Sequence, residues 1–206
     1  MFKKWLHGYC PQQEWINECD TIIVERIEHQ EIPLPHDTKL IYQGRVLQLG
    51  IESVTLPNGK AVELEVLRHP GGAAIVALNQ QKEVCLLRQY RHASGGWLWE
   101  LPAGKLETGE LPQITAAREL VEEAGLQAGQ WDTLGKILAS PGFCDEIIHL
   151  YLARDLTVVA SQPEEDELFE IHWIPFDQAL EQVYDGTLID AKTMLGLTLA
   201  AKFLPV

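Results

Sequence analysis

The sequence predicts a mixed α/β sandwich, because segments of β-strand composition precede and follow one well-defined helical pattern, and two more helical patterns close the chain. The length of 206 residues suits a single domain. Hydrophobic residues make up 46% and charged residues 22%, which is ordinary for a globular protein with a sizeable core. We expect residues 39–206 to form this domain, after an extension of uncertain structure at residues 1–38.

Strand patterns dominate the part of the chain before the central helix. The turn sequence Pro57–Gly59 lies between two of them and predicts a long hairpin or meander. The polar run 79–82 separates two apolar runs and predicts a second hairpin. The predicted strands in this part are 21–29, 40–56, 61–69, 71–78, 83–91 and 97–103.

The clearest helix is predicted over residues 112–124. Pro112 suits the first turn of a helix, and Gly125 suits the position just after its end. Five apolar residues recur at helical spacing and predict the buried stripe: Ile114, Ala117, Leu120, Val121 and Ala124.

The remainder of the chain predicts three more strands and two helices. The strands are 131–139, 146–156 and 168–176, with an acidic loop at 162–167 before the last of them. The two helices lie within residues 176–204 and are joined by the segment 185–190.

Charge and cysteine usage limit the partners and the compartment. The formal net charge of −14 repels nucleic-acid backbones and anionic membranes, so neither is expected as a partner. A small phosphate ligand remains compatible, provided that divalent cations lie between it and the acidic surface. No apolar run reaches 18 residues, and no sustained apolar stretch follows the lysines near the N-terminus. The four cysteines are scattered, which favours reduced thiols in a cytoplasmic protein.

One segment, Gly104–Leu126, carries a regular set of acidic residues. On a helix, Glu119, Glu122 and Glu123 share a face, because each residue turns the chain by about 100°. Arg118 lies one turn before Glu122 and can pair with it, whereas the remaining repulsion is best offset by divalent cations. The alternative is a solvated acidic helix face, which RELVEEAG alone would suggest.

With Gly104, Glu110 and Gly125 in register, this segment resembles the Nudix box, G-x5-E-x7-R-E-U-x-E-E-x-G-U, where U is bulky and apolar. All fixed positions match, and a chance match is on the order of one in 10⁹ per window. The resemblance implies a Nudix-type α/β/α sandwich with a mixed sheet, and a Mg²⁺- or Mn²⁺-dependent hydrolase that cleaves the pyrophosphate of a nucleoside diphosphate linked to another group.

The same resemblance implies roles for individual residues of the segment. Glu119 and Glu123 would be the principal metal ligands, with Glu122 contributing, and Arg118 would orient them. The backbone carbonyl of Ala103 matches a further metal contact of the family.

The flanking sequences resemble the ADP-ribose pyrophosphatase branch, over about residues 66–201. That likeness implies that Arg91 contacts the substrate phosphates, that Glu100 faces the site and that Pro141 belongs to a substrate-binding loop. In the acidic loop 162–167, it implies Glu165 as catalytic base and Glu167 as an additional metal contact. It also implies a homodimer, in which the N-terminal β segment 39–70 takes part.

Other readings stay open at the level of sequence. Within the enzymes, the substrate could be another nucleotide sugar, such as a GDP-sugar, or NADH or a dinucleoside polyphosphate. Outside them, the chain could be a Nudix nucleotide-binding module without catalysis, although its glutamate set is intact and no basic helix-turn-helix segment accompanies it. Trp97, Trp99 and Trp131 are better explained as core residues than as stacking platforms.

Overall fold

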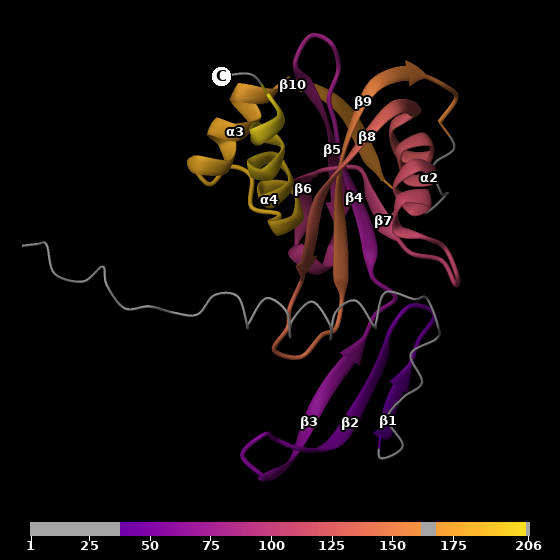
Figure 1. Ribbon diagram of the computed structural model, residues 1–206, viewed down its shortest axis with the longest axis vertical. Helices are drawn as coiled ribbons and strands as arrows, with labels where there is room; N and C mark the ends of the chain where they lie inside the picture. Colours follow the sequence, from indigo (N-terminus) through magenta and orange to yellow (C-terminus); the bar gives the residue numbers. More distant parts are fainter. Residues whose placement is uncertain (1–37, 162–167, 205–206) are drawn as a thin grey trace, which may run out of the picture. The chain divides into compact units, whose positions relative to one another are not determined.

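The computed structural model describes residues 38–161 and 168–204, which form three sheets and three α-helices (Figure 1). The predicted strand 21–29, Glu165 and Glu167 lie outside the described residues. The strands are β1 (Thr38–Gln43), β2 (Gln48–Thr55), β3 (Ala61–Arg68), β4 (Gly72–Ala77), β5 (Glu83–Arg91), β6 (Gly96–Glu100), β7 (Ala103–Lys105), β8 (Leu126–Leu138), β9 (Ile147–Val158) and β10 (Phe169–Pro175). The helices are α2 (Pro112–Ala124), α3 (Phe176–Tyr184) and α4 (Ala191–Ala200), with short 3₁₀ turns at His92–Ser94 and Ala201–Phe203.

The predicted meander is confirmed as an antiparallel sheet of order β1-β2-β3. Its second turn falls at the Pro57–Gly59 signal, where Gly59 adopts a left-handed φ of 82° that favours glycine. The end of β3 contacts the segment between β8 and β9, because Leu67 forms an isolated parallel bridge with Cys144.

The mixed sheet predicted for the domain is confirmed in the order β7-β4-β9-β8. Strand β4 pairs in parallel with β9 and antiparallel with β7, and β8 pairs antiparallel with β9. A second sheet of order β10-β5-β6 completes the sandwich.

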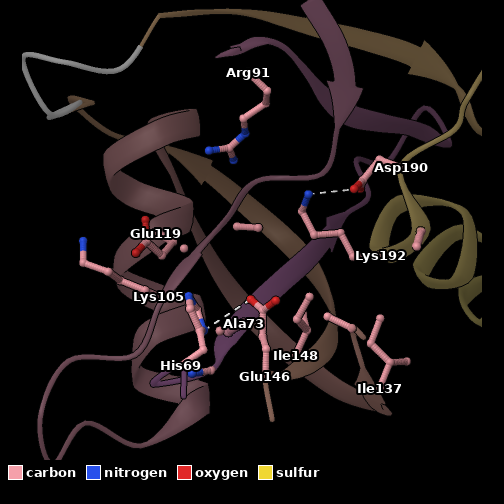
Figure 2. A pocket seen from close by; sticks show the side chains of 16 residues that line it. His69, Ala73, Arg91, Lys105, Glu119, Ile137, Glu146, Ile148, Asp190 and Lys192 are labelled. Carbon is pink, nitrogen blue, oxygen red and sulfur yellow. Dashed lines mark hydrogen bonds and ion pairs between the residues drawn. The ribbon is translucent and has the colours of Figure 1, made fainter. Parts of the chain in front are cut away.

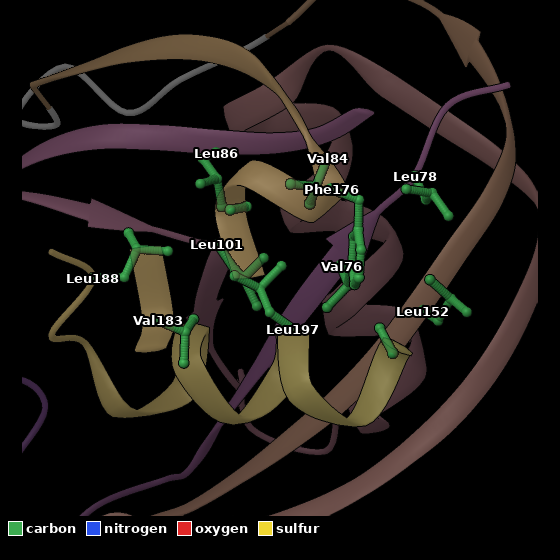
Figure 3. Packing of buried hydrophobic residues seen from close by; sticks show 12 residues of the cluster. Val76, Leu78, Val84, Leu86, Leu101, Leu152, Phe176, Val183, Leu188 and Leu197 are labelled. Carbon is green, nitrogen blue, oxygen red and sulfur yellow. The ribbon is translucent and has the colours of Figure 1, made fainter. Parts of the chain in front are cut away.

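Strand β4 is buried over its whole length, so its two faces supply two apolar clusters. Ala73, Ile75 and Ala77 face the cluster that includes Leu120 of α2. Val76 faces the other cluster, which α3 and α4 cover (Figure 3). Figure 1 accordingly shows α2 on one side of the sheets and α3 with α4 on the other.

Three predicted strand arrangements are wrong in detail. The predicted strand 40–56 divides into β1 and β2, with residues 44–47 between them. The expected second hairpin is limited to its turn, since β4 and β5 enter different sheets; at the turn, Leu78 forms an isolated antiparallel bridge with Val84 and the Asn79 amide donates to the Glu83 carbonyl at 3.0 Å. The predicted strand 97–103 divides into β6 and β7 around Leu101 and Pro102. Proline lacks a backbone donor, and the Leu101 amide donates to the Thr193 hydroxyl of α4 at 2.9 Å instead of to a strand.

Helix α2 has the predicted bounds, with Pro112 in its first turn and Gly125 in a left-handed conformation at its end (φ 62°, ψ 38°). Its buried face differs from the predicted stripe, because Ile114 is 57% exposed whereas Glu119 and Glu123 are buried. The helix therefore turns two of its carboxylates towards the sheet instead of placing all of them in solvent. None of the helices in the described part of the chain is long and apolar enough to cross a membrane.

Candidate active site

Arg118 of α2 connects three glutamates of the acidic segment. Its Nη1 donates to Glu119 Oε1 at 2.7 Å and to Glu122 Oε2 at 2.8 Å. Its Nε and Nη2 donate to the two carboxylate oxygens of Glu110 at 3.0 and 2.9 Å, a bidentate pair. Nη2 also donates to the Lys105 carbonyl at 3.2 Å. The predicted pairing with Glu122 is thus one part of a network that also holds the loop before α2.

Glu110 is held as a carboxylate by this network. Hydrogen bonds from Arg118 lower its pKa to about 2, against the opposing effect of burial, and Thr115 and the Glu107 amide add further donors. Glu110 therefore connects the loop before α2 to the helix itself, which gives this glutamate of the segment a structural role.

Glu110→Gln is expected to destabilise the fold at neutral pH by about 2 kcal/mol, because the charge-assisted bonds to Arg118 weaken. The folded-state pKa of Glu110 is depressed, so its contribution is fully present above the ordinary value of 4.5 and is lost as the pH falls towards about 2. The free energy of unfolding is measured with urea at pH 6 and pH 3. The difference in this free energy between wild type and Glu110→Gln should be smaller at pH 3. The exposed Glu107→Gln is the control, and a gap that stays constant with pH would contradict the argument.

Gly104 and Glu119 are in close contact. A Cβ built on Gly104 would lie 1.9 Å from Glu119 Oε1 and 2.0 Å from its carboxyl carbon. Only a glycine leaves room there for the carboxylate, and Arg118 holds it from the other side. The glycine of the segment therefore admits the Glu119 side chain against strand β7.

Glu123 lies deeper, between α2 and the sheet. It is 1% exposed, and its Oε2 accepts a hydrogen bond from the Ala103 amide at 2.7 Å. Burial, together with the nearby charge of Glu123, raises the pKa of Cys85 to about 12, so that thiol stays protonated and is no nucleophile. Among the described residues, Cys85 and Cys144 are both free of disulfides.

A cleft of about 480 Å³ opens beside these groups (Figure 2). Glu119, Ala103, Gly104 and Lys105 line it from the α2 and β7 side. Its other residues come from the ends of β3 to β5, from β8 and β9, and from the start of α4: His69, Gly71, Gly72, Ala73, Arg91, Ile137, Ala139, Glu146, Ile148, Asp190, Ala191 and Lys192.

Two cations of the cleft share one buried carboxylate. Glu100 is 2% exposed and accepts two bonds from Arg91, both at 3.0 Å, and one from Lys192 Nζ at 2.7 Å. Burial alone would raise the pKa of Glu100, but the bonds from Arg91 and Lys192 outweigh it and lower the pKa. Lys192 also pairs with Asp190 at 3.0 Å, and Asp190 caps α4 through the Thr193 amide. The two hydrogen bonds to buried Glu100 therefore fix the position of the Arg91 guanidinium.

The donor set suits a hard divalent cation, although it is not assembled as a cage. Three carboxylates and the Ala103 carbonyl are the oxygen donors that such ions prefer, and the space that Gly104 leaves accommodates one of the carboxylates. Within residues 38–161 and 168–204, no three acidic, histidine or cysteine side chains are gathered as metal ligands. Glu119 and Glu122 are both held by Arg118.

The other predicted site residues fall at different distances from the cleft. Arg91, Ala103 and Glu119 line it. Glu122 and Glu123 are not among the lining residues, but Glu122 accepts a hydrogen bond from Arg118 and Glu123 accepts one from the Ala103 amide. Pro141 stands in an exposed turn and is not among the lining residues.

The sequence reasoning missed His69, Lys105, Glu146 and Lys192 as cleft residues. His69 and Glu146 face each other with 3.4 Å between His69 Nδ1 and Glu146 Oε1. Of these four, Lys105 carried a local signal, since it follows Gly104 in the segment.

A mixed α/β sandwich in which Arg118-bound glutamates lie beside a cleft lined by both cationic and acidic side chains fits a phosphate-handling hydrolase, and comparison with known proteins supplies the family. The NUDIX domain model matches residues 68–195. An ADP-ribose pyrophosphatase of Bacillus subtilis is 41% identical over 155 residues, covering 74% of this chain and 84% of that protein. A methanol dehydrogenase activator of Bacillus methanolicus is 40% identical over 162 residues, covering 78% and 88%.

The solved structures agree on the fold. A crystal structure of an ADP compounds hydrolase superposes with a TM-score of 0.71 at 20% identity, covering 82% of this chain and 92% of that one. The chain belongs to the Nudix family, and it is a Nudix hydrolase. Enzymes of this family generally use a divalent metal ion.

Proposed function

We propose that this enzyme hydrolyses ADP-ribose to AMP and ribose 5-phosphate with Mg²⁺. The observation that carries the proposal is that Glu119 and the cations Arg91, Lys105 and Lys192 line one cleft. A diphosphate needs both cationic side chains and carboxylates that recruit a metal ion. The relatives called ADP-ribose pyrophosphatase support the choice of nucleotide.

In this proposal, Glu119, Glu123, Glu122 and the Ala103 carbonyl would hold the metal ion, with Glu167 adding a further contact. A bound divalent cation would supply neutralisation of the diphosphate charge and activation of water. Arg118 would keep the carboxylates in place by the bonds described above. Arg91, positioned by Glu100, would bind phosphoryl oxygens.

The reaction adds one water across the anhydride. The water oxygen bonds to one phosphorus, the bond from that phosphorus to the bridging oxygen breaks, and each product keeps one phosphate. We propose Glu165 as the group that takes the water proton, and Pro141 as part of the substrate-binding loop. We also propose that the enzyme is cytoplasmic and homodimeric, with residues 39–70 taking part in the dimer.

A substrate panel tests the proposal. Purified enzyme with Mg²⁺ is given ADP-ribose, GDP-mannose, UDP-glucose, NADH and diadenosine polyphosphates, and the products are separated by chromatography. We expect AMP and ribose 5-phosphate to form fastest from ADP-ribose, with no turnover after chelation of the metal. Faster turnover of another compound would show that ADP-ribose is not the preferred substrate. Binding of nucleotides without turnover of any of them would show that the protein is a nucleotide-binding module without this activity.

A further inference from the structure

The cations that line the cleft differ in how far they are neutralised. Arg91 and Lys192 share Glu100, and Lys192 also pairs with Asp190. Two positive charges therefore face two carboxylates, and this group contributes little net charge to the cleft. Arg118, for its part, is engaged by three carboxylates.

Lys105 is the exception. It lines the same cleft, and within the part of the chain that the structure describes its ammonium group forms no ion pair or hydrogen bond. Its side chain is exposed at the edge of the cleft, on the strand that lies against the Glu119 carboxylate, and Figure 2 shows it extending outward past Glu119, away from Arg91 and Lys192. A hydrated lysine charge of this kind gives up no existing partner when it binds a phosphate.

The main chain of Lys105 is held in place although its side chain is not. Lys105 pairs with Gly72 across β7 and β4, and its carbonyl accepts from Arg118. The next residue, Leu106, donates its amide to the Gly71 carbonyl at 3.1 Å. The base of the side chain is therefore anchored beside the box glutamates, and ligand binding costs only the freedom of the lysine chain itself.

The surroundings explain why a positive charge is needed at this place. The three glutamates around Arg118 exceed its charge by two, and the whole protein is strongly acidic. A diphosphate that approaches this side of the cleft meets net negative potential, and among residues 38–161 and 168–204 Lys105 is the lining lysine or arginine without an ion pair there.

We propose that Lys105 is a substrate-binding residue that contacts a phosphoryl group of the diphosphate, an inference that rests on the proposed function for the choice of nucleotide. The contact is made in the bound ground state and kept during the reaction, so it acts on affinity and leaves the chemical step nearly unchanged. Because an exposed ammonium is screened by salt, its contribution should be largest at low ionic strength.

The test compares wild type with Lys105→Met, Lys105→Arg and Lys60→Met, a control at an exposed lysine of the β2–β3 turn. Calorimetry gives Kd for ADP-ribose and for inorganic pyrophosphate in EDTA, and steady-state kinetics with Mg²⁺ give kcat and KM. For Lys105→Met we expect Kd for both ligands, and KM, to rise about tenfold, with kcat within about twofold. Lys105→Arg should bind both ligands with nearly the wild-type Kd. The difference in Kd between wild type and Lys105→Met should become smaller at 0.5 M NaCl.

The outcomes separate this inference from the proposed function. Wild-type enzyme that binds pyrophosphate but does not hydrolyse ADP-ribose would defeat the proposed function, and the pyrophosphate Kd would still decide the role of Lys105. Equal pyrophosphate affinity of wild type and Lys105→Met, or no measurable binding by wild type, would overturn the role of Lys105. A fall in kcat with unchanged Kd would also overturn it.

Discussion

Gly104→Ala is expected to lower kcat/KM for ADP-ribose by at least about a hundredfold while the protein still folds. The added methyl would lie 1.9 Å from Glu119 Oε1, so the carboxylate must move away. It would then lose its bond to Arg118 and the position proposed for metal binding. The obstacle is the flexible end of a side chain and not backbone, and the φ of Gly104 is not in the left-handed region, so the cost in stability should stay at about 1–2 kcal/mol.

Gly129→Ala is the matched control, because a Cβ at Gly129 would likewise crowd a carboxylate, with Asp155 Oδ2 at 2.5 Å, but outside the cleft and also without a positive φ. Kinetics and the midpoint of thermal unfolding are measured for both variants. Activity of Gly104→Ala within about threefold of wild type would mean that the position of the Glu119 carboxylate has no bearing on turnover.

What the sequence could predict was local. The bounds of α2 follow from Pro112 and Gly125, two residues with direct backbone effects. The acidic segment could be recognised because its glycines and glutamates stand at short, constant spacings along one loop and one helix. The Arg118–Glu122 pair follows from helical geometry alone and is present at 2.8 Å.

What could not be predicted depends on contacts across the chain. Glu100 and Lys192 meet at 2.7 Å although 92 residues separate them, and no pattern near either residue indicates the other. The bidentate bond between Glu110 and Arg118 requires the loop to return onto the helix, which periodicity does not describe. The predicted burial of Ile114 was wrong for a related reason, since hydrophobic spacing cannot reveal that carboxylates occupy the sheet-facing side of α2.

The sheets, too, combine features that local sequence predicts with features that depend on contacts between distant segments. The apolar run of β4 predicted a strand, and full burial on both faces explains why the run has no polar alternation. Its neighbour could not be inferred, because the run pairs with β9, far along the chain, and not with the adjacent β5. Sequence proximity favoured a hairpin, whereas the two strands separate to build opposite sheets around the two clusters.

Glu123→Gln is expected to leave the fold intact and to lower kcat by at least about a hundredfold, as the loss of a metal-ligating charge should. The amide oxygen of glutamine can still accept the Ala103 N–H bond that Glu123 Oε2 now accepts at 2.7 Å, so the link between α2 and β7 is kept. The variant therefore removes a charge from a buried position without removing side-chain volume or the backbone contact.

Its control is Glu181→Gln, an exposed glutamate of α3 that lies outside the cleft. Turnover of ADP-ribose is measured across a Mg²⁺ titration, together with thermal unfolding in EDTA, which reports on the fold without the metal. If Glu123 holds the metal ion, its variant needs more Mg²⁺ for half-maximal turnover and unfolds near the wild-type temperature. Near-normal kcat at ordinary Mg²⁺ would assign Glu123 to the structure of the α2–β7 contact and leave Glu119 and Glu122 as the proposed ligands.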